Sequence, residues 1–195
     1  CSIVDNVSII GIMSRENKVT NGHGGGLYAA DSTVELRSNA GFWHNFASQH
    51  GGAVYATNSM MTIDNASIGY SDDSYSVTNF AMHYGGGVYL DASTLVLTNG
   101  ARIYRSAASI GGGICAFNSQ VKSYGGSSIG NTNHIFRNYA GIGGGIASIN
   151  STLEMEDTEI SGNTAFNNAG ALFSTMTGQH VFTRCRISDN AATGD

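Results

Sequence analysis

The stretch HGGAVYATNS (residues 50–59) places two glycines before an apolar residue and ends on a serine, and close copies recur along the chain. HGGGLYAADS begins at residue 23, and YGGGVYLDAS begins at residue 84. The apolar residues that follow the glycines are Leu27, Val54, Val88, Ile114, Ile146 and Leu172. They lie 27, 34, 26, 32 and 26 residues apart. A period in the range of roughly 20 to 50 residues indicates a solenoid, a propeller or another repeat array.

The residues after each of these apolar positions keep a fixed register. A hydroxyl side chain lies five residues later, at Ser32, Ser59, Ser93, Ser119, Ser151 and Thr177. Apolar residues predominate seven and nine residues later, as at Val34 and Leu36, and we assign Gln179 and Val181 to these positions in the sixth copy. The alternation predicts short, half-buried strands. The hydroxyl residue predicts a turn in which a short side chain bonds nearby backbone.

A third element, apolar-x-x-Asn, precedes each glycine pair. It is clearest at Phe42/Asn45, Ile135/Asn138, Ile160/Asn163 and Ile187/Asn190. Asn17 and Asn79 keep only the asparagine, and Ser106 replaces it in a weaker copy. Stacked asparagines form side-chain amide ladders, so we expect such a ladder here. Each copy then holds three short strands and three turns, which fits a β-helix coil better than a propeller blade of roughly 40–45 residues.

We therefore predict an all-β fold: a single right-handed parallel β-helix over residues 1–195, with about seven coils and three short strands per coil. Glycine suits the corner because it reaches positive φ without a Cβ clash. At a coil spacing of about 4.8 Å, the rod would be roughly 30–35 Å long. The sequence shows no capping helix, so we expect a segment uncapped at both ends, part of a longer chain or of a stacked assembly.

The composition excludes several classes of protein. Hydrophobic residues make up 41% of the chain, and together with the regular repeat this argues against disorder. The net charge is −5 and there is no basic stripe, so we expect no nucleic acid partner. No apolar run approaches the roughly 20 residues of a membrane span.

The pair of motifs Gly-Gly-Ala-[Ile/Leu/Val] and Phe-x-x-Asn is the repeat signature of the chlamydial polymorphic outer membrane proteins, and the chain resembles that family over nearly its whole length. The strict forms occur once each, at residues 51–54 and 42–45. Elsewhere Gly-Gly-Gly replaces Gly-Gly-Ala, and isoleucine replaces phenylalanine. The resemblance implies a secreted or surface-exposed β-helix, often an adhesin.

The alternative is a carbohydrate-active β-helix that binds or, less favoured, cleaves polysaccharides, because some β-helices are polysaccharide hydrolases or lyases. One pectin-cleaving family carries Asn-Thr-Asp, Asp-Asp, Gly-His-Gly and Arg-Ile-Lys motifs in that order. This chain has GHG at residues 22–24, DD at 72–73 and RIY at 102–104. The order differs and Asn-Thr-Asp is missing, so we assign no catalytic residue and keep a carbohydrate-active β-helix as the alternative.

Two groups of side chains were weighed as metal ligands. Asp64, Asp72 and Asp73 are interpreted as a solvated acidic loop rather than a calcium site. His23 and His50 occupy the same position in adjacent copies, and His83 precedes that position in the third copy by one residue. Because zinc usually takes three or four protein ligands, we interpret these histidines as part of a turn rather than as a metal site. We therefore predict no metal and no cofactor.

One residue after each apolar position, the chain carries Tyr28, Tyr55, Tyr89, Cys115, Ala147 and Phe173. Alternation places this column outward. The four aromatic members are interpreted either as a stacking ladder that shields the sheet or as a binding strip for glycans or a partner protein. Cys115 in the same column is a candidate intermolecular thiol.

Sequons make Asn6, Asn65 and Asn150 candidate glycosylation sites. The long loops at about residues 67–80 and 125–135 are expected to carry specific contacts. We expect a non-enzymatic, extracellular structural or adhesive module: a rod or filament segment of a cell-surface or secreted protein. The expected partners are neighbouring β-helix units or other copies end to end, surface glycans, and host or partner proteins.

Overall fold

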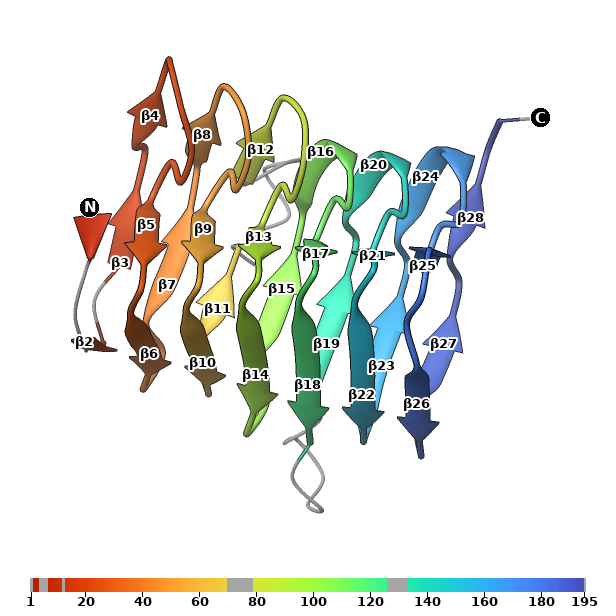
Figure 1. The fold of residues 1–195 in the computed structure, drawn as a ribbon. Coiled ribbons are helices and arrows are strands. Elements are labelled where there is room, and N and C mark those ends of the chain that lie inside the picture. Colours follow the sequence, from red (N-terminus) through yellow and green to blue (C-terminus); the bar gives the residue numbers. More distant parts are fainter. Residues whose placement is uncertain (1, 4–6, 12, 70–78, 126–132, 195) are drawn as a thin grey trace.

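The computed structural model describes residues 2–3, 7–11, 13–69, 79–125 and 133–194, and in these residues the protein is all-β, with no helix. The strands form four parallel sheets of seven strands each, and each strand pairs with the strand four places later in the chain (Figure 1). We call these sheets A to D in chain order, and we call four consecutive strands, one from each sheet, a repeat.

Sheet A contains β1 (Ser2–Ile3), β5 (Leu27–Ala30), β9 (Val54–Thr57), β13 (Val88–Asp91), β17 (Ile114–Phe117), β21 (Ile146–Ile149) and β25 (Leu172–Thr175). Sheet B contains β2 (Val7–Ile10), β6 (Thr33–Arg37), β10 (Met60–Asp64), β14 (Thr94–Thr98), β18 (Gln120–Tyr124), β22 (Thr152–Glu156) and β26 (His180–Thr183). Sheet C contains β3 (Met13–Arg15), β7 (Gly41–Trp43), β11 (Ser67–Ile68), β15 (Arg102–Tyr104), β19 (Asn133–Phe136), β23 (Thr158–Ser161) and β27 (Arg186–Ser188). Sheet D contains β4 (Lys18–Val19), β8 (Asn45–Ala47), β12 (Asn79–Ala81), β16 (Ser106–Ile110), β20 (Tyr139–Ile142), β24 (Thr164–Asn168) and β28 (Ala191–Ala192).

The predicted three strands per coil are wrong, because each repeat has four. The apolar-x-x-Asn element is two strands, as in β7 and β8, which a single residue with left-handed backbone separates. That residue is His44 (φ 55°), Arg105 (φ 52°) or Arg137 (φ 53°) in different repeats. Because the corner residue has no constant type, the pattern does not reveal the turn.

The core lies between the inner faces of the sheets. Sheets A, B and C supply its large side chains, such as Leu27, Leu36 and Ile103, each 0% exposed. Sheet D supplies small residues on its inner face: Ala47, Ala81, Ala140 and Ala165. The apolar columns predicted from the alternation are therefore confirmed as core, except in the sixth copy.

The sixth copy is shifted in register by one residue. His180 pairs with Leu153 and Phe182 with Met155 across β22 and β26. Val181, which we assigned to the core, is 56% exposed. Our assignment of Gln179 and Val181 to the inward positions is therefore wrong, because the corner before β26 contains one residue more than the others.

Two ladders of polar side chains run along the molecule; the asparagine ladder was predicted, whereas the serines were predicted only to mark a turn. The backbone N–H of each corner serine donates to the hydroxyl of the serine in the next repeat, at 2.9–3.1 Å from Ser32 to Ser151. The asparagine ladder lies between sheets C and D, where Asn138 Nδ2 donates to Asn163 Oδ1 at 3.0 Å and to the Ile103 carbonyl at 3.1 Å. Asn138 and Asn163 are 1% and 0% exposed, so the ladder bond between them lies in the interior.

The glycine triplets form the corner between sheets D and A. The first glycine has positive φ, 63° at Gly85 and 66° at Gly111, as we predicted. The second glycine is required for a different reason: a Cβ on Gly112 would lie 2.4 Å from the Tyr139 carbonyl oxygen of sheet D. Most of the two long loops predicted to carry contacts, and Asp72 and Asp73, lie outside the described residues.

Candidate functional site: a histidine–tyrosine layer outside sheet A

A second layer of side chains covers the outer face of sheet A, and we call it the outer layer. One part is the outer column, the residues one position after each core residue of sheet A, from Tyr28 to Phe173. The other part is the corner column, which lies before each glycine corner. Its members are His23, His50, Tyr84, Ile110, Ile142 and Asn168.

The tyrosines of the outer column form a continuous stack. The ring centroids of Tyr28 and Tyr55 are 5.0 Å apart with an interplanar angle of 9°, and those of Tyr55 and Tyr89 are 5.2 Å apart at 17°. In-register pairing of the parallel strands β5, β9 and β13 sets this spacing. Phe173 is not part of the stack, because Cys115 and Ala147 lie between it and Tyr89 in the column.

The histidines of the corner column pack against these tyrosines, each on the tyrosine of the following repeat. His23 lies 4.5 Å from Tyr55, and His50 lies 4.9 Å from Tyr89, measured between ring centroids. His50 also contacts His23 at 4.8 Å and Tyr84 at 4.8 Å. Tyr84 shares the sequence column of the two histidines, but its packing on His50 was not predicted; the constant five-residue separation between the two columns was the available signal.

Burial governs the electrostatics of the layer. Burial lowers the pKa of His23. Burial, and then the charges of His23 and His83, lower the pKa of His50 to about 4, although a hydrogen bond to the Gln49 backbone acts to raise it. The Nδ1 atoms of His23 and His50 are buried and have no hydrogen-bond partner among the described residues. Burial, and then Cys115 and Asp91, raise the pKa of the Tyr89 hydroxyl. The layer therefore favours neutral side chains.

This geometry bears on the two interpretations of the aromatic column. In the tyrosine stack each ring face is turned toward the ring of the next repeat. A sugar ring would need an uncovered aromatic face, and the stack directs mainly ring edges outward. The arrangement favours the shielding ladder over the binding strip for Tyr28, Tyr55 and Tyr89.

Cys115 is not accessible, so our expectation of an intermolecular thiol at this position is wrong. Its side chain is 0% exposed and packs with Tyr89 and Ala147 in a small apolar cluster, where Ile110 and Tyr84 cover it. Burial raises the pKa of the thiol to about 12. Alternation placed Cys115 outside the sheet correctly, but the corner column closes over it.

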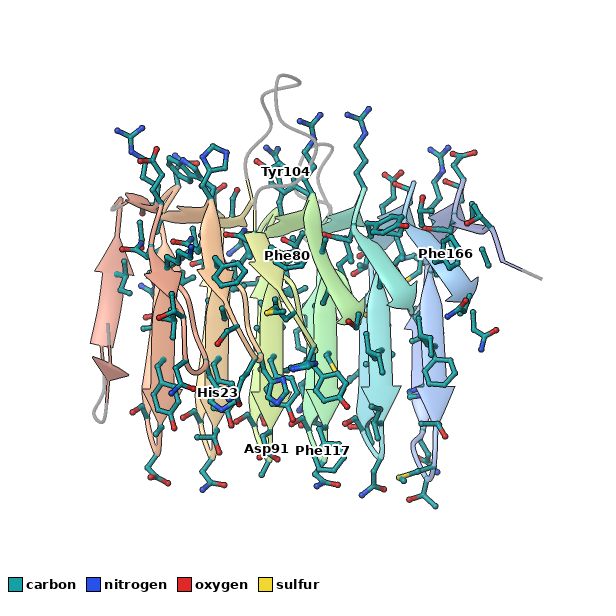
Figure 2. All side chains as sticks on the ribbon, turned by 90° about the horizontal axis from the view of Figure 1, so that it is seen from above. His23, Phe80, Asp91, Tyr104, Phe117 and Phe166 are labelled. Carbon is teal, nitrogen blue, oxygen red and sulfur yellow. The ribbon has the colours of Figure 1, made fainter. Side chains whose placement is uncertain are left out.

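A second surface feature lies on the outer face of sheet D, toward the viewer in Figure 2. Phe80, Tyr139 and Phe166 are 41%, 47% and 58% exposed and line one hollow whose floor includes Ser109 and Gly141. A shift of register between β20 and β24 accompanies Phe166. We did not predict this face, although an aromatic residue directly after the ladder asparagine recurs at Phe46, Phe80 and Tyr139.

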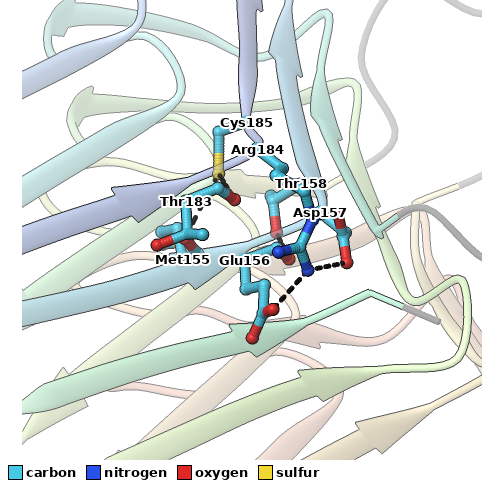
Figure 3. Close-up of polar contacts among 7 residues, drawn as sticks. All are labelled: Met155, Glu156, Asp157, Thr158, Thr183, Arg184 and Cys185. Carbon is cyan, nitrogen blue, oxygen red and sulfur yellow. Dashed lines mark hydrogen bonds and ion pairs between the residues drawn. The ribbon is translucent and has the colours of Figure 1, made fainter. Parts of the chain in front are cut away.

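The acidic side chains at the edge of sheet B are engaged in ion pairs. Arg184 Nε donates to Asp157 Oδ1 at 2.8 Å, and the same guanidinium contacts Glu156 (Figure 3). The hydrogen bond from Arg184 lowers the pKa of Asp157. Within the described part of the chain, no group of three or more His, Cys, Asp or Glu side chains is placed to hold a metal ion.

Two of the three candidate glycosylation sites can be located. Asn65 and Asn150 are exposed at corners with left-handed backbone, whereas Asn6 lies outside the described residues. Asn150 Nδ2 donates to Asn118 Oδ1 at 2.6 Å, so a glycan there would disturb a contact between repeats. Asn65 is the more accessible of the two for modification.

Comparison with known proteins identified no relative of the chain. No family model, no curated protein and no solved structure matches the chain. The described residues contain no helix that is long and apolar enough to cross a membrane.

Proposed function

We propose that the chain is a right-handed parallel β-helix of about seven coils that acts as a non-enzymatic, extracellular structural and adhesive module. The observation that carries the proposal is that the recurring polar residues bond their own copies in neighbouring repeats. Asn45, Asn138 and Asn163 do so between sheets C and D, and the corner serines do so between sheets A and B. The repeat is thus built for rigidity along its axis.

Rigidity supports the role of a rod segment. Seven strands per sheet at about 4.8 Å spacing make a body roughly 30 Å long. The Gly-Gly-Ala and Phe-x-x-Asn signature supports a cell-surface location through its resemblance to polymorphic outer membrane proteins. On such a rod, neighbouring β-helix units are the natural partners along the axis.

The exposed aromatic residues of sheet D support the adhesive role. Contiguous exposed apolar surface often marks an interaction site. Phe80, Tyr139 and Phe166 provide such a surface, in which the Phe80 ring also stacks on Phe46 with the ring centroids 5.8 Å apart. We assign adhesion to cell-surface glycans or proteins to this face.

A repeat deletion tests the architecture. Removing residues 85–110 deletes 26 residues, one whole repeat from glycine corner to glycine corner, and places Gly111 after Tyr84. The shortened chain is expected to keep its β-sheet circular dichroism and to unfold cooperatively. Removing residues 85–97 instead should abolish folding. This deletion takes away β13 and most of β14 but leaves β15 and β16, so one repeat lacks its strands in sheets A and B. Unfolding of both variants would contradict a modular β-helix.

Binding and turnover assays test the activity. The chain is incubated with cell-surface glycan and protein arrays and with polysaccharides, and both binding and release of reducing ends are measured. We expect binding without turnover. Binding should weaken when Phe80, Tyr139 and Phe166 are all changed to serine. It should be unchanged in the control Met60→Ser, which alters an exposed apolar side chain at the start of β10. Reducing-end release by the pure protein would instead favour the carbohydrate-active alternative.

A further inference from the structure

The corner column changes its chemistry along the molecule. At the corners before β5, β9 and β13 it carries His23, His50 and Tyr84, whereas at the next two corners it carries Ile110 and Ile142. The backbone is the same at all five: the N–H of each first glycine donates to the carbonyl of the corner-column residue one repeat later. These bonds are 3.0 Å for Gly24 and 2.9 Å for Gly51, Gly85, Gly111 and Gly143.

Among the described residues, the groups that face the histidines offer no charge to stabilise a cation. His50 is surrounded by His23, His83, Tyr84 and Tyr89, with the His50–His83 ring centroids 5.9 Å apart. The electrostatic neighbours that act on His50 are the two other histidines, which disfavour its protonated form.

The neighbours of His23 are similar. Its ring packs on His50 and Tyr55. In the described part of the chain, the carboxylate that acts on this layer is Asp91, and it acts on Tyr55 and Tyr89. Protonation would therefore put two or three like charges into one partly buried aromatic stack.

We propose that the histidines of the corner column form an acid-sensitive latch: in mild acid the outer layer opens at the corners before β5 and β9, while the aliphatic corners before β17 and β21 stay closed. The latch is a conformational device and does not depend on the proposed adhesive face. Opening exposes the histidine rings to water, where they accept protons without the cost of burial.

The direction follows from linkage. The open state binds the proton at the ordinary histidine pKa of about 6.5, whereas the closed state holds His50 neutral down to a pKa of about 4. Between these values the open state binds more protons, so the ratio of open to closed molecules rises as pH falls, by at most about tenfold per pH unit for one histidine. Above pH 6.5 the latch is closed.

The experiment is amide hydrogen exchange by NMR at pH 7.0 and pH 5.0, corrected for the intrinsic exchange rate. The amides of Gly24 and Gly51 report on the histidine corners, and those of Gly111 and Gly143 report on the aliphatic corners. We expect the protection of Gly24 and Gly51 to fall at least about threefold at pH 5.0, within the limit of about 20-fold that linkage sets for one histidine. The amides of Gly111 and Gly143 should stay protected. An equal change at all four amides, or none, would overturn the latch.

Two variants identify the titrating groups. The double variant His23→Phe/His50→Phe keeps the rings and removes titration, so its Gly24 and Gly51 amides should lose their pH dependence. Persistence of that dependence in a folded double variant would also overturn the latch. If circular dichroism shows that the double variant does not fold, Ile142→His transfers a histidine to an aliphatic corner. The Gly111 amide should then become pH-dependent, and an unchanged Gly111 amide would count against the mechanism.

Discussion

The glycine corner between sheets D and A and the asparagine corner between sheets C and D both recur in every described repeat, but they tolerate change differently. The second glycine is kept at all six glycine corners: Gly25, Gly52, Gly86, Gly112, Gly144 and Gly170. The asparagine ladder, in contrast, accepts Ser106 in one repeat and remains in register on both sides of it.

The difference follows from the kind of interaction at each corner. Steric exclusion has no substitute, since a Cβ on Gly112 would meet the backbone of Tyr139 and Gly144 within 2.6 Å. A hydrogen bond can be partly replaced, and Ser106 still accommodates the ladder because its own N–H donates to Asn138 Oδ1 at 3.0 Å. The glycine corner should therefore be the stricter of the two, and the following substitutions measure by how much.

Gly112→Ala should have the largest effect. The added methyl group clashes with backbone that cannot rotate away, so we expect a loss of about 3 kcal/mol or more in the free energy of unfolding. Urea denaturation monitored by circular dichroism measures it. The control is Gly87→Ala. Its Cβ would approach one backbone atom, the Gly113 carbonyl oxygen, to 2.7 Å, but the equivalent positions hold Ala53 and Ala171, so it should lose less, about 1 kcal/mol. Equal losses in the two variants would contradict the steric argument.

Asn138→Ala should have the second largest effect. It leaves the Ser106 N–H and the Ile103 carbonyl buried without their partner, which we expect to cost about 2–4 kcal/mol. Asn138→Ser copies the natural substitution and should cost less. A loss no greater than that of Asn99→Ala, at an exposed corner, would show that the ladder contributes little to stability.

Ser106→Asn should have the smallest effect and the opposite sign. It places an asparagine at the one ladder position that holds serine. Ser106 lies beside Gly87, and in the other repeats the ladder asparagine lies beside the equivalent glycine or alanine. We expect a gain of about 0.5–1.5 kcal/mol, measured as a higher urea midpoint with an unchanged slope. A lower midpoint would show that the space beside Gly87 has adapted to serine.

Much of the repeat could be predicted from the sequence because its signals are local. The alternation of Val34 and Leu36 marks an inner face, and the constant spacing of the corner serines and ladder asparagines marks stacked turns. The division between sheets C and D could not be predicted, since the corner residue is His44 in one repeat and Arg105 in another. Any residue that tolerates a left-handed backbone suffices at such a corner.

The outer surfaces were predicted least well. Alternation says which side of a strand Cys115 occupies, but the burial of its thiol depends on Ile110 and Tyr84, which reach the same place from the preceding corners. The exposed hollow at Phe80, Tyr139 and Phe166 likewise requires residues from β12, β20 and β24, three strands that come together only after the chain has returned to the same sheet.

The sequence by itself determined the parallel all-β architecture, the core columns of all copies but the sixth, and the asparagine ladder, because each depends on a residue type repeated at a constant separation along the chain. Only the tertiary structure decided how many strands a repeat contains, why the second glycine is required and which outward side chains are covered. Those depend on distances between backbone or side-chain atoms in different strands, such as the close approach of Gly112 to Tyr139.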